Sequence, residues 1–253
     1  MTDERIEVGS SAPAVPPERD SLLLRFWSLI VAPTRACVAI AQRPAWGVAA
    51  VALLVVSALY TGSVLHIIGP EQIEQQIESA GSDEAAMAMA GQLDRMRDPG
   101  PGMRIVIGLA AGVGALLFAV VLPGLVFQLF FRLSEGRGRM AQTFGVVAWT
   151  ALVASTISYG LRALLILGRG SGEGVATGLA LLVPDAPSDS PLFLALNMFG
   201  DVFIWWQVAL MVIGFAVVHA LPLVRSAVVT IAVSVLGGLM ILGVQVISAR
   251  LGG

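Results

Sequence analysis

Five long apolar runs constrain the fold of this chain more than any other feature of its sequence. A helix needs about 20 consecutive apolar residues to cross the core of a bilayer. Because 57% of the residues are hydrophobic and only 13% are charged, the composition also lies far from that of a soluble domain. We therefore predict an all-α fold, a polytopic membrane bundle of five transmembrane helices. The predicted spans lie at about 46–68, 104–131, 143–167, 201–221 and 226–248.

The connector between the second and third runs determines the predicted orientation. Residues 131–140 read FRLSEGRGRM and carry Arg132, Arg137 and Arg139 against the single acid Glu135. Short loops rich in Arg or Lys stay on the cytoplasmic side of a membrane. We therefore expect these three arginines to set the topology, with the N-terminus in the cytoplasm and the C-terminus outside. The expected location is the inner (plasma) membrane of a bacterial cell.

The chain before the first run divides into a polar tail and two short apolar segments. Residues 1–20 mix charges with Pro, Ser and Gly, which predicts a disordered cytoplasmic tail. Residues 21–45 are apolar, but Pro33 and Pro44 break them into halves too short to span. We expect amphipathic helices here, either lying in the membrane interface or packed on the cytoplasmic end of the bundle. The five-span domain then occupies 46–249.

Two longer loops are expected on the outer side. Residues 70–102 are acidic and carry signals of two helices, one opened by Pro70 and one capped by Ser82. Residues 168–197 are rich in Gly, Pro and Ser around an apolar piece too brief to cross the membrane. Aromatic side chains mark the expected boundaries between lipid and water. The predicted interfacial anchors are Phe26, Trp27, Trp46, Trp205 and Trp206.

One charged pair stands out within the apolar runs. Arg162 lies in the third run and Asp201 opens the fourth, so the predicted topology places both in the outer half of the membrane at similar depth. They form an ion pair between neighbouring helices in one interpretation. In the other, Asp201 caps the fourth helix and Arg162 extends separately toward the interface. The sequence leaves both interpretations open.

The sequence does not predict catalytic, cofactor-binding or metal-binding residues. The chain contains no Lys, which excludes a phosphate-loop lysine and a Schiff-base lysine. It also contains neither HExxH nor GxSxG, and its two histidines, His66 and His219, lie at opposite ends of the predicted topology. The net charge of -2 does not favour a nucleic-acid partner. The expected partners are the lipid bilayer and either other membrane proteins or further copies of the chain.

Three passages resemble the bacterial branch of the Yip family, the Ypt-interacting-protein domain. They are APTRACVAIAQRPAW before the first span, EGRGRMAQTFGVVAW leading into the third, and DVFIWWQVALMVIGFAVV in the fourth, and the resemblance covers about 22–248. It implies a five-span membrane protein with a cytoplasmic amino end. Eukaryotic relatives are linked to Rab-type GTPases and vesicle traffic, whereas bacterial members have no settled activity.

Together these features predict a non-enzymatic protein that acts by association. We expect a scaffold, assembly factor or accessory subunit that binds proteins or lipid through its interfacial helices and its acidic outer loop. A small-solute transporter or channel subunit is the alternative. Transporters ordinarily place several ionisable residues along a path, and the apolar runs of this chain contain few.

Overall fold

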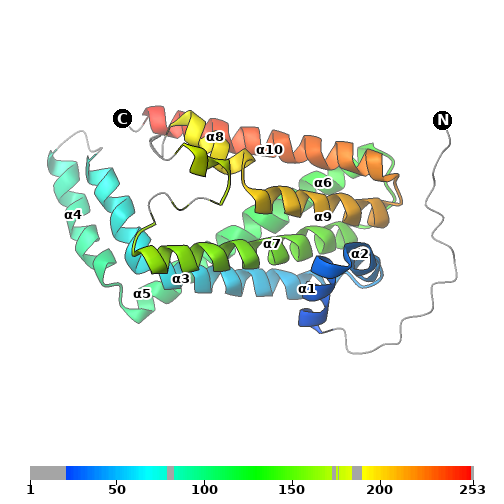
Figure 1. The fold of residues 1–253 in the computed structure, drawn as a ribbon, viewed down its shortest axis with the longest axis horizontal. Coiled ribbons are helices and arrows are strands. Elements are labelled where there is room, and N and C mark those ends of the chain that lie inside the picture. Colours follow the sequence, from blue (N-terminus) through cyan, green and yellow to red (C-terminus); the bar gives the residue numbers. More distant parts are fainter. Residues whose placement is uncertain (1–20, 79–82, 173–174, 176, 184–189, 252–253) are drawn as a thin grey trace.

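The protein is a bundle of helices, five of which are long and apolar enough to cross a membrane (Figure 1). The structure is a computed structural model that describes residues 21–78, 83–172, 175, 177–183 and 190–251. The predicted tail at 1–20 and the predicted cap Ser82 lie outside these residues. The predicted all-α polytopic fold is confirmed. The spans found in the described chain are Trp46–Ile77, Pro101–Leu133, Met140–Arg169, Val202–His219 and Leu223–Gln245.

The helices follow one another closely along the chain, except between α7 and α8, where residues 170–190 intervene. In order, they are α1 (Leu22–Val31), α2 (Pro33–Gln42), α3 (Trp46–Glu78), α4 (Asp83–Arg97), α5 (Pro101–Leu116), α6 (Leu122–Leu133), α7 (Met140–Arg169), α8 (Pro191–Phe199), α9 (Val202–His219) and α10 (Leu223–Leu251). A π-helical turn, Leu117–Val121, joins α5 to α6, and a 3-10 turn, Leu179–Leu182, precedes α8.

Helix α7 is the centre of the bundle. It packs against α3, α9, α6 and the two N-terminal helices, and Figure 1 shows it between α3 and α9. Every residue from Thr143 to Ala154 is buried, which is the pattern of a helix surrounded by protein rather than lipid. By contrast, α10 lies at the edge of the bundle, and most of its large apolar side chains are exposed.

The first span does not end where the sequence indicated. We predicted that Pro70 opens a new helix, but α3 continues through it to Glu78. A proline within a helix removes one backbone hydrogen bond, and here the packing of α4 against α3 supports the continuation. Met96 of α4 lies beside Gly69 of α3, and Ile73 on the following turn is buried.

The π-helical turn in the second span lies directly before Pro123, which occupies the first turn of α6. Proline has no N–H to donate, and a π turn is a common place for a helix to accommodate such a break. The second span therefore remains continuous from Pro101 to Leu133.

Two glycines allow α3 and α5 to approach closely. A Cβ atom built at Gly108 would lie 2.8 Å from the carbonyl oxygen of Ala58, and one at Gly112 would lie 2.7 Å from that of Leu54. Real Cβ atoms essentially never come so close to an oxygen. Small residues spaced by four bring the backbones of membrane helices together, and here the Gly108–Gly112 pair serves packing within the chain.

We expect Gly112→Ala to destabilise the protein by about 1 to 3 kcal/mol, because the added methyl group forces α3 and α5 apart. Gly114→Ala is the matched control, since a Cβ there meets nothing within 4 Å. The measurement is unfolding of both purified variants in detergent micelles. Equal stability of the two variants would contradict the close packing of α3 on α5.

Candidate functional site

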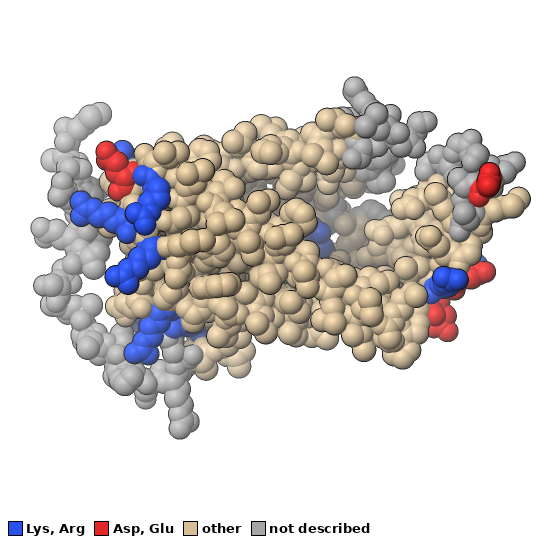
Figure 2. Space-filling model, turned by 180° about the vertical axis from the view of Figure 1, so that it is seen from behind, with Lys and Arg blue, Asp and Glu red and all other residues tan. Residues whose placement is uncertain are grey.

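The residues that could carry function gather in polar clusters at the two ends of the span bundle. Figure 2 shows charged side chains at both ends and an almost uncharged middle. One end, which we call the connector end, holds the α6–α7 connector, α1 and α2. The other, which we call the arm end, holds α4 and the C-terminal part of α3.

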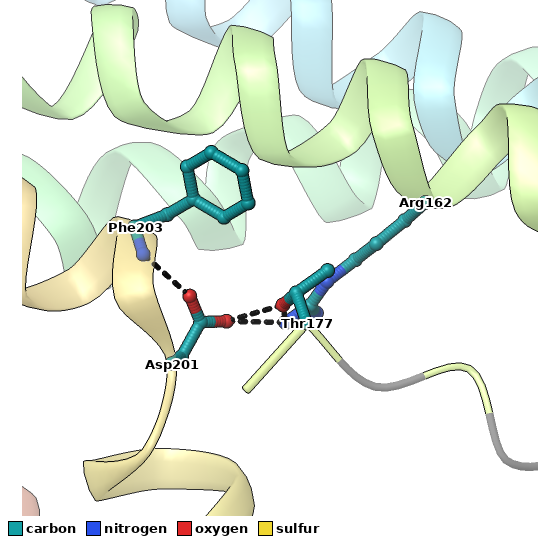
Figure 3. Close-up of polar contacts among 4 residues, drawn as sticks. All are labelled: Arg162, Thr177, Asp201 and Phe203. Atoms are coloured by element: carbon teal, nitrogen blue, oxygen red, sulfur yellow. Dashed lines mark hydrogen bonds and ion pairs between the residues drawn. The ribbon is translucent and has the colours of Figure 1, made fainter. Parts of the chain in front are cut away.

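Toward the arm end, Arg162 and Asp201 lie within hydrogen-bond distance of each other. Nη2 of Arg162 on α7 lies 2.7 Å from Oδ2 of Asp201, the residue directly before α9. The hydroxyl of Thr177 donates to the same carboxylate oxygen at 2.6 Å and accepts from the arginine at 2.8 Å. Figure 3 shows the three side chains closing a triangle.

Asp201 has a second role in the same position. Its other oxygen, Oδ1, accepts the backbone N–H of Phe203 at 2.8 Å, which caps the first turn of α9 (Figure 3). The two interpretations of the sequence therefore do not exclude each other, because one carboxylate has two oxygens. With its side chain almost fully buried and both oxygens engaged, Asp201 joins α7, α9 and the segment between them.

Thr177 is the member of this cluster that sequence reasoning missed. It lies in a stretch rich in Gly and Ala that follows no helical or strand pattern, so no spacing rule points to it. Its place beside Asp201 depends on how the chain after α7 turns back. Nearby, the backbone N–H of Leu179 donates to the carbonyl of Gly200 at 3.2 Å.

A second cluster at the connector end surrounds His219, the last residue of α9. The ring is fully buried and lies stacked on Phe131, with ring centroids 4.4 Å apart. Its Nδ1 accepts the backbone N–H of Gly138 at 3.2 Å. Its Nε2 lies 3.1 Å from the hydroxyl of Thr143, which in turn donates to the Gln128 side chain. This arrangement requires a neutral imidazole with the proton on Nε2.

The connector is shaped around this histidine. A Cβ atom at Gly136 or Gly138 would lie 2.8 or 2.7 Å from Nδ1 of His219, so these positions need glycine for close approach to the ring. The backbone N–H of Arg137 donates to the carbonyl of His219 at 3.3 Å. The glycines are buried, whereas the arginines expected to set the topology are exposed. Those arginines are Arg132, Arg137 and Arg139.

Sequence reasoning did not identify His219 as the organising residue of the connector. The alternation of glycine and arginine in EGRGR was a usable signal, because glycine at alternate positions indicates close approach of the backbone to another group. The identity of that group could not be read from the sequence, since His219 lies 81 residues from Gly138.

Helices α1 and α2 each bury one face against the bundle. Figure 1 shows α1 crossing the direction of the spans at the connector end. Arg25 and Leu29 of α1 are buried, and so are Cys37 and Ile40 of α2. The opposite face of α1 exposes large apolar side chains, including Trp27. The inner faces thus pack on the protein, and the outer face of α1 is exposed.

The five predicted anchors differ in exposure. Trp27, Trp46 and Trp205 are exposed, and Phe26 and Trp206 pack partly against the core. The indole N–H of Trp205 donates to the carbonyl of Phe199 at 2.6 Å. Trp46 packs beside Phe144, with ring centroids 5.6 Å apart. The structure places Phe26, Trp27 and Trp46 at the connector end, whereas Trp205 lies in the first turn of α9 near Asp201.

The described residues contain no cluster of three or more His, Cys, Asp or Glu side chains that could hold a metal ion. Cys37 is fully buried in α2, and burial raises the pKa of its thiol to about 12. A thiol with such a pKa is protonated and unreactive at neutral pH.

Comparison with known proteins identifies one domain. The family model of the Yip1 domain matches residues 27–244, most of the chain. No curated protein and no solved structure shows a significant match.

We expect a double-mutant cycle on Arg162→Gln and Asp201→Asn to show a coupling energy of about 1 to 3 kcal/mol. Each single substitution removes one charge and leaves the opposite charge unpaired in a largely buried site. Asn is as good a cap residue as Asp, so Asp201→Asn removes the charge and keeps the bond to Phe203. The measurement is the free energy of unfolding of each variant in micelles. Additive effects of the two substitutions would show that the side chains are not energetically coupled.

Proposed function

Because this chain belongs to the Yip1 family, we propose that it is a non-enzymatic multi-pass membrane protein that acts by association. In this proposal it is a scaffold, assembly factor or accessory subunit for other proteins of the membrane. Lipid contacts hold the helices α1 and α2 in place. The observation that carries the proposal is the α3–α4 arm, which consists of α4 and the end of α3 after Pro70, projects from the other helices and has an exposed surface (Figure 1).

Polar contacts hold the arm together and connect it to the end of α7. Arg97 of α4 forms a salt bridge with Glu74 of α3 at 3.1 Å, and Ile73 of α3 is buried. Glu71 accepts the backbone N–H of Gly172, which follows α7, with both carboxylate oxygens at 2.9 and 3.1 Å. An arm fixed to the bundle loses little conformational freedom when a partner binds, which favours association.

The polar groups within the bundle support the same proposal. Asp201 is engaged by a guanidinium, a hydroxyl and a backbone N–H, and His219 is engaged at both ring nitrogens. A general base or nucleophile must be able to reach a substrate, whereas these groups connect helices. They support association over catalysis.

We further propose that the connector end faces the cytoplasm of a bacterium and that the arm end faces outward. The exposed arginines of the connector and the lack of any acid in residues 21–45 make the connector end basic, and basic loops stay inside. Helices α1 and α2 then lie at the inner interface. This orientation places the N-terminus inside and the C-terminus outside the inner (plasma) membrane.

Crosslinking in intact membranes tests the association. We expect a photo-crosslinking amino acid in place of Met87 on α4 or Trp27 on α1, which are 76% and 59% exposed, to capture one reproducible protein partner. Leu164 on α7 is the matched control at 73% exposure, because it faces lipid within a span and should capture none. Self-crosslinks alone at all three positions would contradict the accessory role and favour transport by a homo-oligomer.

Thiol labelling tests the orientation. We expect the unmodified protein to resist a membrane-impermeant maleimide up to about pH 9, because thiolate is scarce well below a pKa of about 12. Against this background, Arg137→Cys should react only in opened cells and Met87→Cys should react in intact cells. Labelling of Arg137→Cys in intact cells would overturn the proposed orientation.

A further inference from the structure

The exposed face of α1 is apolar. In the described part of the chain, the exposed side chains of this helix are Leu23, Leu24, Trp27 and Val31, each between 59% and 74% exposed. Spacings of four residues connect Leu23, Trp27 and Val31, so these side chains lie on one face of the helix. Exposing large apolar side chains to water is unfavourable, and this face therefore needs an apolar environment.

Helix α2 differs from α1 in this respect, although both helices bury one face against the same bundle. The exposed side chains of α2 are those of Thr34, Arg35 and Gln42, all of them polar. Two neighbouring helices at the connector end thus present free faces of opposite character. This contrast indicates that the free face of α1 meets hydrocarbon and that the free face of α2 meets water.

The apolar face of α1 lies near the surface that the first span presents to lipid. Leu22 of α1 and Val48 of α3 line the same cavity, so the start of α1 lies beside the first turn of α3. From Val48 an exposed apolar strip follows α3 at spacings of three or four residues. Its further members are Val51, Val55 and Leu59. The lipid-facing strip of the first span therefore begins at the level of α1.

The length and direction of α1 place it in one leaflet. Its ten residues give a length of about 15 Å, half of the roughly 30 Å that a span must cross. Figure 1 shows the helix crossing the direction of the spans. Its one charged residue, Arg25, is buried on the opposite face. Insertion of the free face thus relies on apolar contact and on gaps between lipids rather than on attraction to anionic headgroups.

We propose that the free face of α1 inserts into the leaflet at the connector end as a wedge, so that the protein concentrates where that leaflet is convex. A helix lying in one leaflet occupies area there, and a convex leaflet offers looser packing between headgroups. The inference rests on the membrane placement in the proposed function. It names lipid as the partner of α1 and leaves protein association to the arm, so that Met87 becomes the expected crosslinking position for protein.

Spin labelling in liposomes tests the insertion. A nitroxide on Trp27→Cys should be relaxed more by oxygen, which dissolves in hydrocarbon, than by a water-soluble nickel complex. Arg35→Cys on the polar face of α2 is the matched control and should show the reverse. Cys37 is fully buried and should stay unlabelled. Access of the nickel complex to position 27 would place α1 in water. Protection from both reagents would show that protein covers the face, from this chain or a second copy.

Sorting between vesicles of different size tests the wedge. An impermeant fluorescent maleimide on Arg137→Cys marks, in intact proteoliposomes, only molecules whose connector end faces outward, on the convex side. We expect the labelled protein to be about two- to threefold denser per lipid in vesicles of about 50 nm than in vesicles of about 400 nm. Other apolar surfaces are the same in every variant, so differences between variants report α1 alone.

Two double variants in this background complete the experiment. Leu24→Ala with Trp27→Ala should abolish most of the size preference, because it shrinks the wedge. Val51→Ala with Leu59→Ala is the matched control, since these α3 side chains are 64% and 68% exposed but lie within a span. Equal density in both vesicle sizes, or an equal loss in both double variants, would overturn the proposal. Because purified protein is used, such a failure leaves the crosslinking test of protein association unaffected.

Discussion

The structure depends on one constraint: the buried carboxylate of Asp201 and the buried ring of His219 must find their partners within the protein. An unsatisfied polar group in hydrocarbon costs several kcal/mol. The carboxylate of Asp201 meets this constraint with three donors from three parts of the chain. His219 meets it at the other end through a backbone N–H and a hydroxyl. Each cluster fixes the relative position of α7 and α9, so that the same pair of helices is held at both ends.

Charged residues are arranged differently at the two ends of the molecule. At the connector end, glycines allow the chain to pass directly over the His219 ring while the arginines between them stay exposed. At the arm end, charged side chains such as Arg97 and Glu74 join α4 to the C-terminal end of α3. The first arrangement keeps positive charge at the membrane surface. The second holds α4 against the end of α3.

The sequence by itself determined the fold class and the family, because the length and apolarity of a span follow directly from the thickness of the bilayer. It also placed Arg162 and Asp201 at similar depth, since helical rise converts residue number into distance along the span. Only the tertiary structure decided that α3 runs through Pro70, that Thr177 completes the Asp201 cluster and that the connector wraps His219. These outcomes depend on contacts between residues 24 to 81 positions apart, or on packing that outweighs a local preference. Local patterns cannot specify either, because they describe one helix at a time.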